Sequence, residues 1–150
     1  MEIINYFPKV QEYINCTPAQ QKEKVIEEIK EVRAELEVRF RDKKKVVEEL
    51  LDTVQAIYTL NYILNVPYHS CISLSKCNLK IKELDGNFTF YLSYVKNLNV
   101  DDLYSLVKLQ DIQQEILYFV FLLCDKNKFT FTEKLEKHLE KMKSRNLEFI

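Results

Sequence analysis

The chain of 150 residues is long enough for one domain with a hydrophobic core and too short for two. Apolar residues make up 47% of it and charged residues 30%, which excludes a disordered polymer. A formal net charge of −1 excludes a strong field that would recruit nucleic acid or an anionic membrane. One glycine and three prolines are too few for the many turns of an all-β fold, so we expect an all-α helical bundle. From the net charge, we expect no nucleic-acid or membrane partner.

The cysteines and the longest apolar run indicate the cellular compartment. The four cysteines, Cys16, Cys71, Cys77 and Cys124, form no CxxC pair, so we expect free thiols rather than a zinc site. The longest apolar run, Ile116–Cys124, is far shorter than the roughly 20 residues that span a bilayer. The first residues lack the basic and apolar regions of a secretory signal. These features predict a cytoplasmic protein.

The first half of the chain predicts three helices. A short helix over Glu2–Asn15 would carry Pro8 in its first turn. Thr17 and Pro18 form a helix start signal, and apolar residues then recur at steps of three and four over Ala19–Phe40.

A second long helix follows almost at once. Asp42 can cap it, and it extends over Lys43–Asn65 with its apolar residues on one side. Because the connection is so short, the two long helices should pack as an antiparallel hairpin.

The segment after Pro67 allows two interpretations. Apolar and polar residues alternate over Leu79–Lys82 and again over Phe88–Tyr91, on either side of Asp85-Gly86. This pattern is typical of a small β-hairpin with a two-residue turn. A helical insertion made of two short helices joined at Gly86 fits equally well, because periodicity over such short runs does not discriminate.

Two more helices complete the predicted bundle. One begins at Asp101 or Asp102, runs to Cys124, and is so apolar in its second half that it should be central. The other, over Thr132–Arg145, is charged on most of its surface. Excess apolar surface on a helical protein of this size is often covered by a second subunit, so we expect a homodimer or a higher homo-oligomer. The candidate interface elements are Asp111–Cys124 and Tyr68–Asn99.

Carboxylates lie beside the apolar stripes of the two long helices. On the first helix Glu28 and Glu31 are three residues, or about one turn, apart. On the second helix Glu49 and Asp52 have the same spacing. When the helices pack, four carboxylates in a half-buried groove repel one another, and a hard divalent cation with oxygen ligands neutralises them. The pattern predicts a site for Mg²⁺, for which Mn²⁺ could substitute.

Basic residues accompany these carboxylates. Lys24 and Lys45 lie about one turn before Glu28 and Glu49, where they suit a polyphosphate arriving at the metal. Glutamate is also a strong helix former, so an EExxE sequence by itself is more often a solvated helix face. Its combination with ExxD beside an apolar stripe favours the metal site. Glu27 and Glu35 are weaker candidates for a carboxylate role at this site.

The carboxylate pattern resembles the signature of a known family. It stands as Glu27-Glu28-x-x-Glu31, seventeen residues, then Glu49-x-x-Asp52, which is similar to the MazG-like nucleotide pyrophosphohydrolases among the all-α nucleoside triphosphate pyrophosphatases. The resemblance implies one helical domain over residues 1–150 that cleaves a nucleoside triphosphate to the monophosphate and pyrophosphate. It also implies catalytic, Mg²⁺-binding roles for Glu28, Glu31, Glu49 and Asp52.

The resemblance extends to the last predicted helix. Lys141 and Arg145 look like the family's late K-x-x-x-R pair, which contacts phosphates. Either Glu28 or Glu31 would orient or deprotonate the attacking water. Two other functions remain open, an all-α dUTP diphosphatase with similar motifs and a helical module that binds a nucleotide or a partner without turnover.

Overall fold

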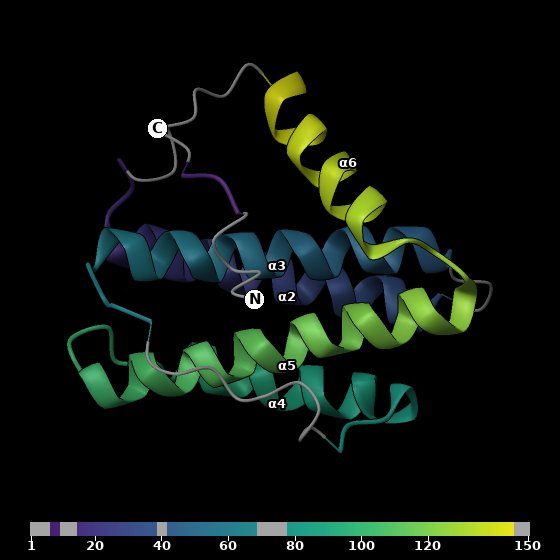
Figure 1. Cartoon of the computed structure of the whole chain (residues 1–150). Helices are drawn as coiled ribbons and strands as arrows, with labels where there is room; N and C mark the ends of the chain where they lie inside the picture. Colours follow the sequence, from purple (N-terminus) through teal and green to yellow (C-terminus); the bar gives the residue numbers. More distant parts are fainter. Residues whose placement is uncertain (1–6, 10–14, 39–41, 69–77, 146–150) are drawn as a thin grey trace.

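The computed structural model describes residues 7–9, 15–38, 42–68 and 78–145. Over these ranges the chain is helical and contains no strand, which confirms the predicted fold class (Figure 1). A 3₁₀ turn, η3 (Ile81–Glu83), precedes one of the helices. The α-helices are α2 (Pro18–Glu37), α3 (Lys43–Ile63), α4 (Leu84–Lys96), α5 (Leu103–Asn127) and α6 (Phe131–Ser144).

The start signals of the first two helices act as predicted. The Thr17 hydroxyl accepts a hydrogen bond from the Gln20 amide at 3.1 Å, and the Gln20 side chain accepts one from the Thr17 amide at 2.9 Å. This reciprocal capping box satisfies two amides that the helix leaves unpaired. Asp42 caps α3 by accepting from the Lys44 amide at 2.9 Å. The bounds of α2 and α3 are therefore largely local properties of the sequence.

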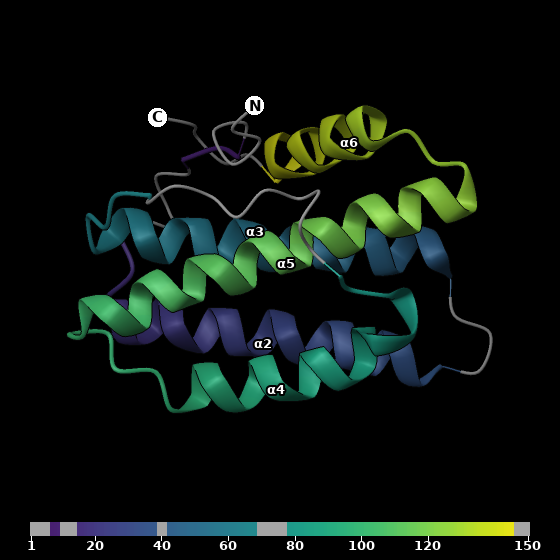
Figure 2. The same cartoon turned by 60° about the horizontal axis from the view of Figure 1, so that its bottom comes forward.

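Among the described helices, α2 and α3 lie at the centre of the packing, and each is covered by a further helix. α2 packs against α3 and runs in the opposite direction, since Gln21 contacts Ala56 at one end and Glu35 contacts Lys45 at the other. α4 packs on α2, and α5 packs on α3. α6 crosses over α3, which thus contacts three helices (Figure 2). A site on α3 can therefore receive side chains from both α2 and α6.

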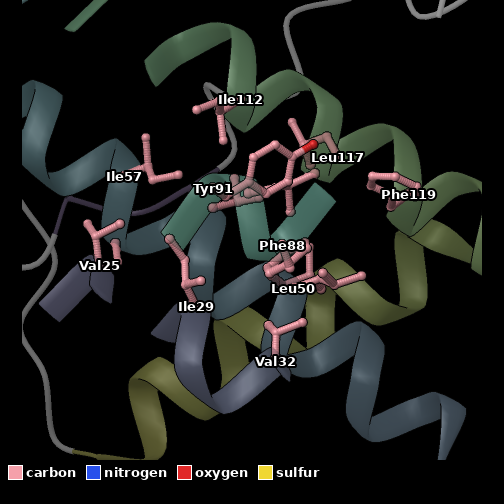
Figure 3. Packing of buried hydrophobic residues seen from close by; sticks show 14 of the residues in the cluster. Val25, Ile29, Val32, Leu50, Ile57, Phe88, Tyr91, Ile112, Leu117 and Phe119 are labelled. Carbon is pink, nitrogen blue, oxygen red and sulfur yellow. The ribbon is translucent and has the colours of Figure 1, made fainter. Parts of the chain in front are cut away.

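Two aromatic rings of α4 lie in the middle of the core. Phe88 and Tyr91 are buried and meet edge to face, with ring centroids 5.1 Å apart. Figure 3 shows Tyr91 among side chains from α2 (Ile29) and α5 (Ile112 and Leu117). Truncating an aromatic side chain in such a place costs about 3–5 kcal/mol. α4 is thus part of the core that fixes the position of α2.

The β-hairpin interpretation of the 79–92 segment is wrong, and the helical alternative is right in a modified form. Gly86 lies inside the first turn of α4 and does not join two helices. The decisive pair is Phe88, which is fully buried, and Phe90, which is 60% exposed. A strand would place both on one face, whereas the buried positions Leu84, Phe88, Tyr91 and Val95 have helical spacing.

α5 and α6 match their predicted bounds to within a few residues. The predicted helix over Glu2–Asn15 lies mostly outside the described residues, and Pro8 is in non-helical chain. α5 continues to Asn127, where Lys128 adopts a left-handed conformation with a φ of 61°. Most apolar side chains of Asp111–Cys124 are buried in the chain's own core, and Tyr118, Phe121 and Leu122 are half-buried. Among the described helices, none has the length and apolarity needed to cross a membrane.

Candidate metal centre

Three of the four predicted carboxylates come together where α2 faces α3. Glu28, Glu31 and Glu49 each offer an oxygen within 4.8 Å of the others. The buried stripe of α2, which includes Val25 and Ile29, turns the adjacent glutamates toward α3. Glu28 is only 7% exposed, while Glu31 is exposed and Glu49 is half-buried. The cluster is therefore anchored at one side and open to solvent at the other.

Burial and neighbouring carboxylates disfavour the charged forms of Glu28 and Glu49. Burial raises the pKa of Glu28 to about 7, with the nearby charges of Asp52 and Glu31 adding to the effect. Burial, a hydrogen bond with Glu31 and the charge of Asp52 raise the pKa of Glu49 to about 7. Within the described part of the chain, the buried oxygens Glu28 Oε2 and Glu49 Oε2 have no hydrogen-bond partner.

Of the two lysines that the sequence analysis selected, Lys24 forms an ion pair with a member of the acidic cluster. Lys24 Nζ lies 3.1 Å from Glu28 Oε1 and compensates that carboxylate from the solvent side. Lys45 Nζ of α3 lies 3.9 Å from Glu35 Oε2 of α2. Lys45 is therefore paired with one of the weaker carboxylate candidates and not with a member of the acidic cluster.

Asp52, the fourth predicted ligand, is held by α6. Lys141 Nζ donates to Asp52 Oδ2 at 2.6 Å, and His138 Nδ1 lies 3.4 Å from Asp52 Oδ1. Burial alone would raise the pKa of Asp52, but His138 and Lys141 outweigh burial and hold it below the ordinary value. Asp52 is therefore an ionised carboxylate beside the cluster, and its charge contributes to the raised pKa of Glu28 and Glu49.

His138 is a site residue that the sequence analysis did not select. It is 4% exposed, and its Nε2 lies 3.1 Å from Gln55 Oε1. The Gln55 amide nitrogen donates to the Pro8 carbonyl at 2.8 Å, so its Oε1 is the atom that faces His138 Nε2. Nδ1 then faces Asp52. The available signal was its spacing from Lys141, since residues three apart share a helix face.

Two spaces of different size adjoin Asp52. A narrow cleft of about 30 Å³, roughly the volume of one water molecule, is lined by Lys24 and Glu28 of α2, by Asp52, and by Met142 and Arg145 at the end of the chain's last helix. On the other side of Asp52, a hollow of about 230 Å³ separates α3 from α6. Its basic lining residues are Lys134, Lys137, His138 and Lys141.

The donor set fits a hard divalent cation. Carboxylate oxygens are the protein ligands that Mg²⁺ and Mn²⁺ take, and three are already within 4.8 Å of one another. Two of them carry a buried oxygen without a partner in the described chain, which a cation would satisfy.

Comparisons with protein-family models, with curated proteins and with solved structures find no match to this chain. Function must therefore be inferred from the motif and from the geometry of its residues.

Proposed function

We propose that this chain is a Mg²⁺-dependent nucleoside triphosphate pyrophosphohydrolase. It would hydrolyse the α–β phosphoanhydride of a nucleoside triphosphate or its deoxy form, giving the monophosphate and pyrophosphate. The observation that carries this proposal is the cluster of Glu28, Glu31 and Glu49 beside an ion pair between Asp52 and Lys141. Concentrated carboxylates next to basic side chains are what a metal–polyphosphate substrate requires.

The acidic residues would hold the metal and prepare the water. Bound Mg²⁺ supplies charge neutralisation to the triphosphate and acidifies water. Glu28 and Glu49, with pKa values of about 7, would give up their protons to bind it. Glu31, the exposed member, is placed to reach a solvent-derived nucleophile, and Glu28 is the alternative base.

The basic residues would receive the leaving pyrophosphate. Lys141 pairs with Asp52, its side chain is 31% exposed, and it lines the basic hollow. Lys24 and Arg145 line the narrow cleft on the other side of Asp52. Because that cleft has room for about one water molecule, a nucleotide can enter it only if the end of α6 shifts.

The experiment is pyrophosphate release from a panel of nucleoside triphosphates, dUTP included, with Mg²⁺ or Mn²⁺. Glu31→Gln and Asp52→Asn should each lower the rate by about 10²-fold or more, because each removes charge that is needed in the transition state. Glu27→Gln is the control, since Glu27 is on the same helix, its 64% exposed side chain lies 3.8 Å from Lys24 Nζ, and it is outside the acidic cluster of the described residues.

Each outcome separates the alternatives. Release confined to dUTP would assign the all-α dUTP diphosphatase activity instead of a broader one. Metal binding without release from any substrate would leave a non-catalytic binding module. Equal rates for Glu27→Gln and Glu31→Gln would remove the acidic cluster from the mechanism.

The proposal also includes a cellular compartment and an oligomeric state. Cys124 is a free thiol, as suits the reducing cytoplasm, where we propose that the protein acts. Phe90, Leu103 and Tyr104 are each at least 60% exposed, which supports a homodimer or a larger homo-oligomer. Light scattering would contradict this if the mass in solution were that of one 18.0 kDa chain.

A further inference from the structure

A separate hollow lies at the end of the bundle where α2 and α5 finish and α3 and α4 begin. This is the right-hand end in Figures 1 and 2. The hollow has a volume of about 290 Å³ and shares no lining residue with the acidic cluster. Four helices and the η3 turn surround it, so its walls are set by the same packing that builds the core.

The apolar part of the lining is purely aliphatic. Leu84 and Leu123 are almost fully buried at its base, and Leu36 and Ile81 are half-buried nearer its mouth. Among the residues that the structure describes, no aromatic ring, amide or hydroxyl side chain lines the hollow. A nucleobase would find no ring to stack on, and a sugar would find no neutral donor or acceptor. An alkyl chain is the ligand group that this lining suits. The aliphatic residues are Leu36, Val46, Ile81, Leu84 and Leu123.

The charged part of the lining is predominantly basic. Lys43 of α3, Lys82 of η3 and Lys126 of α5 lie around the hollow, against the single carboxylate of Asp85. Neither Lys82 nor Lys126 forms an ion pair with any residue that the structure describes. Positive charge from three separate elements converges on an aliphatic depression, which is the arrangement that binds an anionic head group on an apolar tail.

We propose that this hollow binds an aliphatic carboxylate of medium chain length. Its volume of about 290 Å³ suits a small ligand, and octanoate, with roughly ten non-hydrogen atoms, is the probe that we choose. The alkyl chain lies against Leu84 and Leu123, and the carboxylate is neutralised by Lys82 and Lys126. This site does not depend on the metal centre or on the proposed hydrolysis.

Isothermal titration with three probes tests the proposal, in buffer without Mg²⁺. Octanoate should bind at least about tenfold more tightly than acetate, which lacks the chain, and than octanol, which lacks the charge. The double variant Lys82→Gln/Lys126→Gln should weaken octanoate binding about tenfold and leave octanol binding unchanged. Lys96→Gln, an exposed lysine of α4 outside the hollow, is the control and should bind like the parent.

Three results would overturn the site. They are octanol binding as tightly as octanoate, acetate binding as tightly as octanoate, and no binding of octanoate at millimolar concentration. The Glu31→Gln variant should bind octanoate with the affinity of the parent. This last measurement separates the two sites, because loss of pyrophosphate release in that variant leaves the octanoate result intact.

Discussion

Asp52 lies where α3 meets α6, and its partners determine both its charge and its orientation. Its side chain is 11% exposed, and that of Lys141 is 31% exposed, so their 2.6 Å contact is only partly screened by water. Removing one member of a buried pair leaves the other charge without compensation, which costs more than a surface pair contributes.

The variant Lys141→Met tests this pair. We expect it to lower the free energy of unfolding at neutral pH by about 1–3 kcal/mol, because Asp52 then keeps only His138 beside it. Urea denaturation measures the difference. Lys137→Met, one turn earlier on α6 and exposed, should lie within about 0.5 kcal/mol of the parent. Equal effects of the two substitutions would contradict an important role for the Asp52–Lys141 pair.

The candidate site was only partly predictable from the sequence at the scale of residues. Glu28, Glu31 and Glu49 could be grouped because helical periodicity places them beside the two apolar stripes that must meet. The partners of Asp52 could not be found in that way. They depend on how α6 docks across α3, which is a long-range packing outcome without a local sequence signal.

At the scale of elements, helix ends were predictable wherever a side chain caps them. Thr17 and Asp42 begin α2 and α3 as the sequence indicates. The error occurred at α4, where no side chain caps the start and alternating apolar residues imitated a strand. Over four residues a period of 2 and a period of 3.6 cannot be told apart, and tertiary burial of Phe88 and Tyr91 decides the outcome.

Gly86 offers a direct measurement on that element. It lies in the first turn of α4, and a Cβ added there would meet no other atom within 4 Å. Gly86→Ala should therefore stabilise the protein by about 0.5 kcal/mol, since alanine loses less backbone entropy on folding. Thermal unfolding measures this shift. A lower melting temperature would contradict the helical assignment, and Thr17→Ala, which removes a cap, should destabilise by about 1 kcal/mol.

At the scale of the whole molecule, the acidic cluster sets how stability depends on pH. The pKa values of Glu28 and Glu49 rise from an ordinary 4.5 to about 7 in the folded chain, so the folded state binds more protons than the unfolded state between these values. Stability without metal should therefore fall as pH rises from about 5 to about 8. Melting temperatures across this range measure the slope, and Glu49→Gln should flatten it.

Divalent cations should reverse this loss. Mg²⁺ competes with protons for the same carboxylates, so its stabilisation should grow with pH and reach about 2.7 kcal/mol at 100 times its dissociation constant. Glu27→Gln should respond like the parent, because Glu27 lies outside the cluster. A melting temperature that millimolar Mg²⁺ and Mn²⁺ leave unchanged at about pH 8 would contradict the metal centre.

The attachment of α6 has a further consequence. This helix meets α3 through Lys141 and His138, so the contacts that fix its position are also contacts of the candidate site. A polyphosphate that draws Lys141 away from Asp52 must loosen that attachment. Amide hydrogen exchange along Phe131–Ser144 should then become faster when a polyphosphate binds beside Asp52, and a sequence change that tightens the attachment of α6 should slow the release of that ligand.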